Sequence, residues 1–351
     1  MPEILPVNWL PDGRLPASSS AAVQRAADIL TRGGLVAIPT ETVYGLAALA
    51  TDAAAVARIF RAKGRPATNP LIVHVADAAM ASPLVRVWPQ RATTVAAAHW
   101  PGPLTLVLPA TKLVPEIVRA GGGTVAVRCP QHPVTAALLR LLGQPLAAPS
   151  GNRSGMLSPT TAAHVAASLG DAVDLILDGG TCDCGIESTV VDLTTEPPQL
   201  LRPGPIDRST LAASLGCQLL GGSAVDQAAS SSGVHRSPGL LLKHYAPEAD
   251  LEVSSESTAR VKQRLKHGER VGWVTLGGHS SSELLQEVGE GMLHHRDLPD
   301  EPAGYARQLY ACLHDLDRLA VTAIVVETPP RSELWQAVHD RLTRAAHRDA
   351  I

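Results

Sequence analysis

The sequence has few aromatic residues and no excess of positive charge. Aromatic residues make up 3% of the 351 positions, so base-stacking platforms of the RNA-recognition type are not expected. Thirty Lys and Arg against 33 Asp and Glu give a formal net charge of −3. That balance provides no global basic field to drive nucleic-acid binding, although it leaves a local basic patch open.

Targeting signals are also missing from the sequence. No apolar run approaches the roughly 20 residues that a membrane span requires. The N-terminal stretch MPEILPVNWLPDGRLP lacks the basic-then-apolar layout of a signal peptide. We therefore expect a cytoplasmic protein with no membrane partner.

The cysteines do not form a recognisable framework. Five are present, and an odd, scattered set argues against structural disulfides. Cys182 and Cys184 suggest a metal site, but no second Cys pair or His pair follows at ligand spacing, which favours reduced thiols and no bound metal over structural zinc. The P-loop, Gly-x-Ser-x-Gly and His-Glu-x-x-His signatures are absent as well, which excludes the enzyme classes that depend on them.

The length and composition predict two globular domains. Hydrophobic residues make up 45% and charged residues 18%, a globular balance, and 351 residues is a soft prior for two domains. We expect an α/β domain over 18–206, a linker over 207–249 and a smaller open α/β domain over 250–351 without a dinucleotide-binding glycine turn. Consecutive strands near 186–202 favour a mixed sheet in the first domain. The Ser, Ala and Gly of 221–239 are typical of a mobile linker.

Hydrophobic periodicity and capping residues predict the individual elements. In the first domain the expected helices cover 18–33, 52–64, 133–142 and 159–169, with a further short helix after Pro205. The expected strands there cover 35–39, 70–75, 104–108, 124–128, 146–149, 175–177, 189–193 and 199–201. In the second domain we expect strands near 251, at 270–276 and at 323–327, with helices at 257–267, 281–288, 303–319 and 332–346.

The densest polar cluster directly follows the first strand. The segment 39–46, PTETVYGL, places two hydroxyls and a carboxylate at a strand end, where open α/β sheets position ligands. A helix-capping turn explains the same residues equally well. Lys63 and Arg65 suit the helix dipole at a C-terminus, but Pro66 ends the helix and places Arg65 on a loop where it can contact phosphate.

Other strand ends repeat this pattern of cations and hydroxyls. Thr124 and Arg128 lie at the two ends of one predicted strand, and the loop 148–158 leads into a helix N-terminus with Ser158 as its expected cap. Helix N-termini bind phosphate, although an ordinary turn also fits. His74 in an apolar strand is, by itself, more often a satisfied core residue than a ligand. Four strand-end cations nonetheless suit a polyanionic nucleotide with a small zwitterion and require no covalent nucleophile: Lys63, Arg65, Arg128 and Arg202.

Taken together, these segments resemble the YrdC-like family, and the whole chain resembles its two-domain members, the threonylcarbamoyl-AMP synthases. The resemblance covers about 18–349 and runs through PTETVYGL, KGRPATNPLIVHV, WPGPLTLVL, TVAVRCPQHP, APSGNRSGMLSPT, DGGTCDCGIESTVVD, LRPG and SPGLLLKHYAP. The family's Lys-x-Arg and Ser-x-Asn signature is present as Lys63/Arg65 and Ser150/Asn152. Gly151 stands where the family more often has Ala. The implied fold is a YrdC-like mixed twisted sheet followed by a Rossmann-like C-terminal domain.

The resemblance also implies a reaction and its residues. L-threonine, bicarbonate or CO₂, and ATP would give L-threonylcarbamoyl-AMP and pyrophosphate, with Mg²⁺ accompanying ATP. The product would pass to tRNA threonylcarbamoyl-transferase machinery that modifies the adenosine beside the anticodon. Lys63 and Arg65 would act on the phosphates. Threonine would be lined by Thr42, His74, Thr124, Arg128, Ala148 and Ser188, and the nucleotide by Arg65, Asn69, Ser150, Asn152, Ser158, Arg202 and Tyr245.

Two alternatives and one open question accompany this interpretation. A double-stranded RNA- or tRNA-binding module is disfavoured by the net charge and the few aromatics, but weak tRNA binding is left open. Carbamoyl-AMP chemistry, as in hydrogenase-maturation relatives, would require upstream modules for which residues before 18 leave no room.

We expect the linker 207–249 to close over the first domain as a lid with Tyr245 near the nucleotide. The simpler interpretation is that Tyr245 anchors the start of the second domain.

Overall fold

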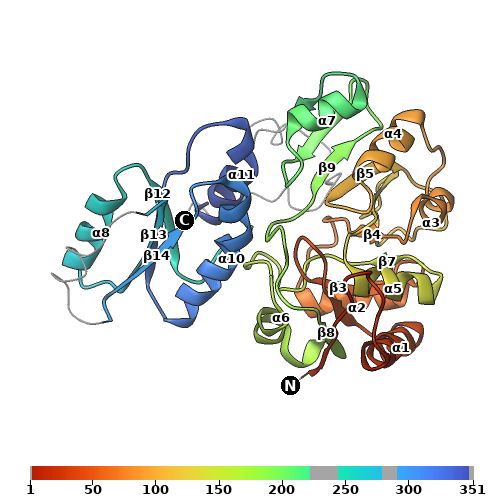
Figure 1. Cartoon of the computed structure of the whole chain (residues 1–351), viewed down its shortest axis with the longest axis horizontal. Coiled ribbons are helices and arrows are strands. Elements are labelled where there is room, and N and C mark those ends of the chain that lie inside the picture. Colours follow the sequence, from red (N-terminus) through yellow and green to blue (C-terminus); the bar gives the residue numbers. More distant parts are fainter. Residues whose placement is uncertain (1, 222–243, 279–290, 348–351) are drawn as a thin grey trace. The chain divides into compact units, whose positions relative to one another are not determined.

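The computed structural model describes residues 2–221, 244–278 and 291–347 (Figure 1). These residues form two compact units, each described here by itself. Unit 1 comprises the described residues up to 154, then 158–183 and 187–221. Unit 2 comprises the described residues from 244 onward and also two short segments, Gly155–Leu157 and Cys184–Ile186.

Unit 1 is a large mixed sheet with helices on its faces, as Figure 1 shows. Its strands follow the order β1-β8-β2-β3-β7-β4-β6-β5-β9-β10-β11. The strands are β1 (Glu3–Pro6), β2 (Val36–Ile38), β3 (Gly45–Leu49), β4 (Ile72–His74), β5 (Leu104–Pro109), β6 (Thr124–Arg128), β7 (Leu146–Ala147), β8 (Leu175–Asp178), β9 (Thr189–Asp192), β10 (Gln199–Arg202) and β11 (Leu220–Gly221). The helices are α1 (Ala17–Thr31), α2 (Ala53–Lys63), α3 (Ala78–Ala81), α4 (Gln90–His99), α5 (Pro133–Leu142), α6 (Ala162–Leu169) and α7 (Arg208–Leu215).

Register in the middle of this sheet places polar residues side by side. His74 of β4 pairs with Arg128 of β6, which in turn pairs with Thr105 of β5. Because side chains alternate between the two faces of a strand, this row shares one face. The next row, in which Val127 lies between Val73 and Leu106, faces a buried apolar core on the other side.

Helix caps explain how α2 presents its last residue. Asp52 accepts hydrogen bonds from the backbone N–H groups of Ala54 and Ala55, which satisfies the start of the helix. Gly64 ends it with a left-handed φ of 59°, a conformation that glycine adopts without a Cβ penalty. Lys63 is therefore the last helical residue, and the chain turns directly into the loop that carries Arg65.

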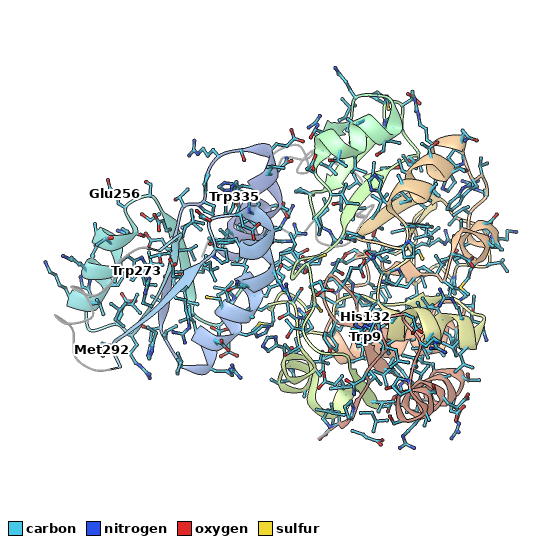
Figure 2. The ribbon with its side chains drawn as sticks, viewed as in Figure 1. Trp9, His132, Glu256, Trp273, Met292 and Trp335 are labelled. Atoms are coloured by element: carbon cyan, nitrogen blue, oxygen red, sulfur yellow. The ribbon has the colours of Figure 1, made fainter. Side chains whose placement is uncertain are left out.

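Unit 2 is a four-stranded parallel sheet with helices, in the order β12-β15-β13-β14. Its strands are β12 (Asp250–Ser254), β13 (Val271–Leu276), β14 (Leu293–Leu298) and β15 (Ala323–Glu327). Its helices are α8 (Ser257–Lys266), α10 (Pro302–Arg318) and α11 (Gln336–Ala345). Trp273, labelled in Figure 2, lies on β13 within a small apolar core. The predicted fold class, a mixed sheet with helices followed by a smaller open α/β sheet, is confirmed.

Several local expectations need correction. Strands β1, β3, β11 and β14 and helices α3 and α4 were not predicted. β3 is rich in alanine and β14 reads LHHRDL, so neither shows the alternation typical of a strand. Ser158 does not cap α6, because Thr161 accepts the capping bond from the His164 N–H. Most of the predicted linker 207–249 and the predicted helix 281–288 lie outside the described residues, whereas α7 belongs to unit 1.

Candidate functional site

Arg128, at the end of β6, contacts two residues of the loop between β2 and β3 and one carbonyl just before β5. Its Nη1 donates to Thr42 Oγ1 at 2.8 Å, and its Nε donates to the Gly102 carbonyl at 3.3 Å. Nη2 lies 2.7 Å from Glu41 Oε1, a close ion pair whose alignment does not make it a hydrogen bond. Both side chains of the pair are about 95% buried, with exposures of 4% and 5%. The loop thus balances the charge of Arg128 and fixes its plane.

His74 lies beside Arg128 and is nearly fully buried. Burial, and secondly the positive charge of Arg128, lower its pKa to about 3, so the imidazole is neutral near pH 7. Its Nδ1 has no hydrogen-bond partner among the described residues. His74 is therefore not the satisfied core histidine that its apolar strand alone suggests.

Ser188, Thr105 and Arg202 form a second network on the same side of the sheet. Ser188 Oγ lies 2.7 Å from Thr105 Oγ1 and accepts from Arg202 Nη2 at 3.1 Å. Arg202 Nε also donates to the Ser188 carbonyl at 3.0 Å. All three residues are buried, and Thr105 pairs directly with Arg128 across the strands. Thr105 thus stands next to Arg128 in the sheet and bonds to Ser188, the two residues predicted on the threonine side.

Lys63 is buried and holds the loop that follows β7. Its ammonium group donates to the backbone carbonyls of Ser150 and Asn152. Burial, and secondly the charge of Arg65, lower the pKa of Lys63 well below its usual value. A lysine has three N–H donors, so one of them is left for another acceptor. The structure therefore brings together the two halves of the Lys-x-Arg and Ser-x-Asn signature.

Arg65 and Asn69 contact each other on the loop after α2. Arg65 Nη2 donates to Asn69 Oδ1 at 2.6 Å and to the Pro70 carbonyl at 2.7 Å. Its Nε donates to the Asn69 carbonyl at 3.0 Å. The side-chain Nδ2 of Asn69 is buried and has no partner among the described residues. This loop therefore presents both a cation and a free amide donor.

The remaining predicted residues occupy different places. Ala148 is buried and donates its N–H to the Ile72 carbonyl at 3.0 Å, beside the β4 strand. Ser158 is fully buried and donates to Glu187 Oε1. Thr124 begins β6 and so lies at the opposite strand end from Arg128, roughly 13 Å along the strand at about 3.3 Å per residue.

Tyr245 lies in unit 2. It is 1% exposed, its ring centroid lies 6.0 Å from that of Tyr310, and the Arg341 guanidinium lies 5.2 Å from its ring centre. These contacts fit a residue that anchors the start of the second unit. A nucleotide contact by Tyr245 stays a prediction.

Sequence reasoning assigned no ligand or catalytic role to three buried residues of the site. Glu41 pairs with Arg128, Thr105 joins Ser188, and Glu187 accepts from Ser158. Thr105 is the one hydroxyl in the strand LTLVLP, and a lone polar residue in an apolar strand is the signal that could have found it. Glu41 and Glu187 stand next to predicted residues, but nothing in the sequence shows what they contact.

A second buried histidine, His132, lies near Glu41. His132 packs edge-on against Trp9, with ring centroids 4.9 Å apart, and Figure 2 shows the two side chains together. Burial lowers the pKa of His132 to about 4, while the nearby Glu41 charge opposes that shift. His132 is therefore a neutral neighbour of the Glu41–Arg128 pair near pH 7.

Unpartnered buried polar atoms gather at this site. Burying a polar group without a hydrogen bond costs about 1–3 kcal/mol, so such atoms are expected where a ligand supplies the partner. Arg128 Nη2 and Glu41 Oε1 face each other as an ion pair; beyond them, the described part of unit 1 has such atoms at Glu41 Oε2, Asn69 Nδ2, His74 Nδ1 and His132 Nδ1. These atoms come from separate loops and strands, and all of them belong to side chains of the site or to their direct neighbours.

The described residues offer no resident metal centre. No group of three or more His, Cys, Asp or Glu among them could hold a metal ion, and none of the cysteines there is in a disulfide. Within the same residues, no helix combines the length and apolar character needed to cross a bilayer.

Comparison with known proteins gives consistent similarities. A family model described as Telomere recombination and named for Sua5, YciO and YrdC matches residues 28–204. The model for the threonylcarbamoyl-AMP synthase C-terminal domain matches residues 206–347. Threonylcarbamoyl-AMP synthase from Pyrococcus abyssi is 39% identical over 92% of this chain and 94% of its own length. The Bacillus subtilis enzyme of the same name is 38% identical over 94% of each chain.

One solved structure is similar over both units. The crystal structure of P. abyssi Sua5 complexed with L-threonine matches with a TM-score of 0.85 and 37% identity. The match covers 98% of this chain and 97% of that chain.

Proposed function

The chain belongs to the threonylcarbamoyl-AMP synthase family, a family of nucleotidyltransferase-type enzymes, and we propose that it makes L-threonylcarbamoyl-AMP from L-threonine, bicarbonate or CO₂, and ATP, with release of pyrophosphate. The observation that carries this proposal is the gathering of unpartnered buried polar atoms between a charge-balanced arginine and a pair of clustered cations. This arrangement suits a small zwitterion and a polyanion held side by side.

Threonine is assigned to the Arg128 end of the site. A guanidinium held in plane by Thr42 and Gly102 can donate hydrogen bonds from its remaining N–H groups to a carboxylate. The neutral His74 offers a free ring nitrogen next to it, and the Ser188–Thr105 hydroxyls lie beyond. Ala148 and Thr124 complete the set expected from the family resemblance, with Thr124 at the other end of its strand.

ATP is assigned to the Lys63 end. Lys63 and Arg65 supply positive charge. Lys63 contacts the carbonyls of Ser150 and Asn152, and Arg65 contacts Asn69. Ser158, which follows in the same stretch of chain, contacts Glu187. Arg202 would add a third cation from beside Ser188, to which it is hydrogen-bonded. Threonine carbamate is an anion that must attack the α-phosphorus of a polyanion. Clustered cations in a partly dehydrated site offset that repulsion and hold the reactants in line.

Other parts of the proposal concern ions, partners and the linker. Mg²⁺ would enter with ATP as part of the substrate, bound chiefly to the phosphates. The product would be passed to tRNA threonylcarbamoyl-transferase machinery in the cytoplasm, as the first step in modifying the adenosine beside the anticodon. The expectation that 207–249 closes as a lid falls largely on residues 222–243, which lie outside the described part of the chain.

The test is a synthesis assay with purified full-length protein, ATP, threonine and labelled bicarbonate. We expect a labelled mixed anhydride by mass spectrometry and pyrophosphate release that requires both threonine and bicarbonate. Pyrophosphate release from ATP that is indifferent to threonine would overturn the proposal and favour carbamoyl-AMP chemistry.

A further inference from the structure

Glu41 is a buried carboxylate whose position calls for a hydrogen-bond donor. It is 4% exposed, and neither of its oxygens has a hydrogen-bond partner among the described residues. Its only ion pair there is with Arg128, through Oε1. A buried, ionised carboxylate with an open oxygen is costly unless a cation or donor completes its surroundings.

The surroundings of Arg128 show which kind of group would fit. Thr42 and the Gly102 carbonyl already accept hydrogen bonds from two of its N–H groups, and Glu41 lies against the third nitrogen, Nη2. A threonine carboxylate placed on the remaining donors carries its ammonium group within a few ångströms, because both groups are bonded to the same carbon. The adjacent negative group is Glu41, so the pair can recognise both charges of one amino acid.

The proposed reaction requires that this ammonium group lose a proton before it can attack carbon. We propose that Glu41 is the general base that accepts the proton as the amine attacks bicarbonate; this rests on the proposed function. The threonine ammonium, bicarbonate and the Glu41 carboxylate give the carbamate anion, water and the Glu41 carboxylic acid. A new N–C bond forms, the C–OH bond of bicarbonate breaks, and the leaving hydroxide takes a second amine proton to become water.

His74 is the other candidate base, and its environment argues against it. Burial and the Arg128 charge keep its pKa at about 3, so adding a proton there places a second positive charge beside Arg128. A proton on Glu41 instead removes a buried negative charge, and the substrate carboxylate then compensates Arg128. His74 is better suited to orient threonine through its free ring nitrogen.

The experiment compares the two directions of the reaction in Glu41→Gln. Forward synthesis from threonine, bicarbonate and ATP should fall by roughly 100-fold or more, the range for loss of a general base. ATP formation from synthetic threonylcarbamoyl-AMP and pyrophosphate should stay close to wild type, because that direction starts from a carbamate already made. Raising bicarbonate at a fixed alkaline pH, where threonine forms carbamate in solution, should restore part of the forward rate.

Two further variants complete the test. Glu196→Gln removes an exposed glutamate that is also ion-paired, with Arg91, and should leave both directions unchanged. Glu41→Asp retains a carboxylate and should keep more forward activity than Glu41→Gln.

The outcomes separate the alternatives. Forward and reverse rates that fall together, without rescue by bicarbonate, would mean that Glu41 only positions Arg128 or supports the fold, and would overturn the proposal. An unchanged forward rate in Glu41→Gln would overturn it too. If wild-type protein makes no anhydride at all, the proposed function itself has failed.

Discussion

The two ends of the site treat buried charge differently. At the Arg128 end, the guanidinium is paired with Glu41 and the local charge is balanced. At the Lys63 end, the ammonium is bonded to backbone carbonyls, and Arg65 to amide and carbonyl oxygens of Asn69 and Pro70, groups without formal charge. Burial, and secondly the charge of Arg65, lower the pKa of Lys63 at this end.

The difference indicates what each end selects. A balanced ion pair can exchange partners with a zwitterion at little net cost, so it favours recognition by geometry and hydrogen bonding. A buried ammonium bonded to backbone carbonyls, with a second cation beside it, is costly until an anion arrives, so this end favours a phosphate chain. The predictions below test this division of roles.

The largest expected effect is discrimination between amino acids at the Arg128 end. 2-Aminobutyrate lacks the hydroxyl of threonine and would leave buried polar groups unpaired, so its kcat/KM should be lower by roughly 10⁴-fold. Competition assays with both amino acids measure the ratio. Arg65→Ala should leave that ratio unchanged, because it acts at the other end. Equal turnover of the two amino acids would remove the hydroxyl-reading role from Thr42, Thr124, Arg128 and Ser188.

The next effect concerns stability. Arg128→Met leaves Glu41 buried without its counter-charge and should lower the free energy of unfolding by about 3–5 kcal/mol. Denaturant unfolding measures it. Adding Glu41→Gln to this variant should recover part of the loss, since the stranded charge is gone. A loss below about 1 kcal/mol would show that the pair behaves like a surface ion pair.

A smaller effect is expected on nucleotide affinity. Arg65→Ala and Arg202→Ala should each weaken ATP binding by about 1.5–3 kcal/mol, the range for a hydrogen bond to a charged group. Calorimetric titration with a non-hydrolysable ATP analogue measures this, and circular dichroism checks that the fold is retained. Unchanged affinity in both variants would contradict the assignment of these cations to phosphate.

The smallest effect is a pH dependence at His74. Its pKa of about 3 in the folded state lies below the ordinary histidine value of 6.5, so at intermediate pH the unfolded chain binds a proton that the folded protein does not. Stability is therefore lost as the pH falls below 6.5. Between pH 6.5 and 5, wild type should lose roughly 2 kcal/mol more than His74→Gln, at about 1.36 kcal/mol per pH unit. Parallel unfolding curves would show that His74 is solvated.

Much of the fold was predictable because its elements carry local signals. Asp52 and Gly64 mark both ends of α2, and β6 was predicted with its observed bounds. β3 was missed because the sequence Gly-Leu-Ala-Ala-Leu has no strand preference of its own. Its pairing with β2 and β7 makes it a strand, and tertiary pairing overrides such weak propensities.

The sequence predicted many of the residues of the candidate site but few of the contacts between them. The motifs named Lys63, Arg128 and Ser188, but only the sheet register shows that Thr105 lies between the last two. The Glu41–Arg128 pair joins residues far apart in the sequence, and no spacing rule relates them. Long-range pairs of this kind come from topology.

Two short segments of unit 2 that come early in the sequence affect the order in which the protein folds. Gly155–Leu157 and Cys184–Ile186 belong to unit 2, where Ala246 donates to the Gly155 carbonyl at 3.0 Å. Gly185 lies so close to α10 that an added Cβ would meet the Arg307 backbone at 2.5 Å. Chains emerge from the ribosome N-terminus first, so Gly155–Leu157 waits for Ala246 to be synthesised and Cys184–Ile186 waits for α10. Ser158 and Glu187 directly follow these segments, and their hydrogen bond is therefore expected to form late, after most of the chain has been made.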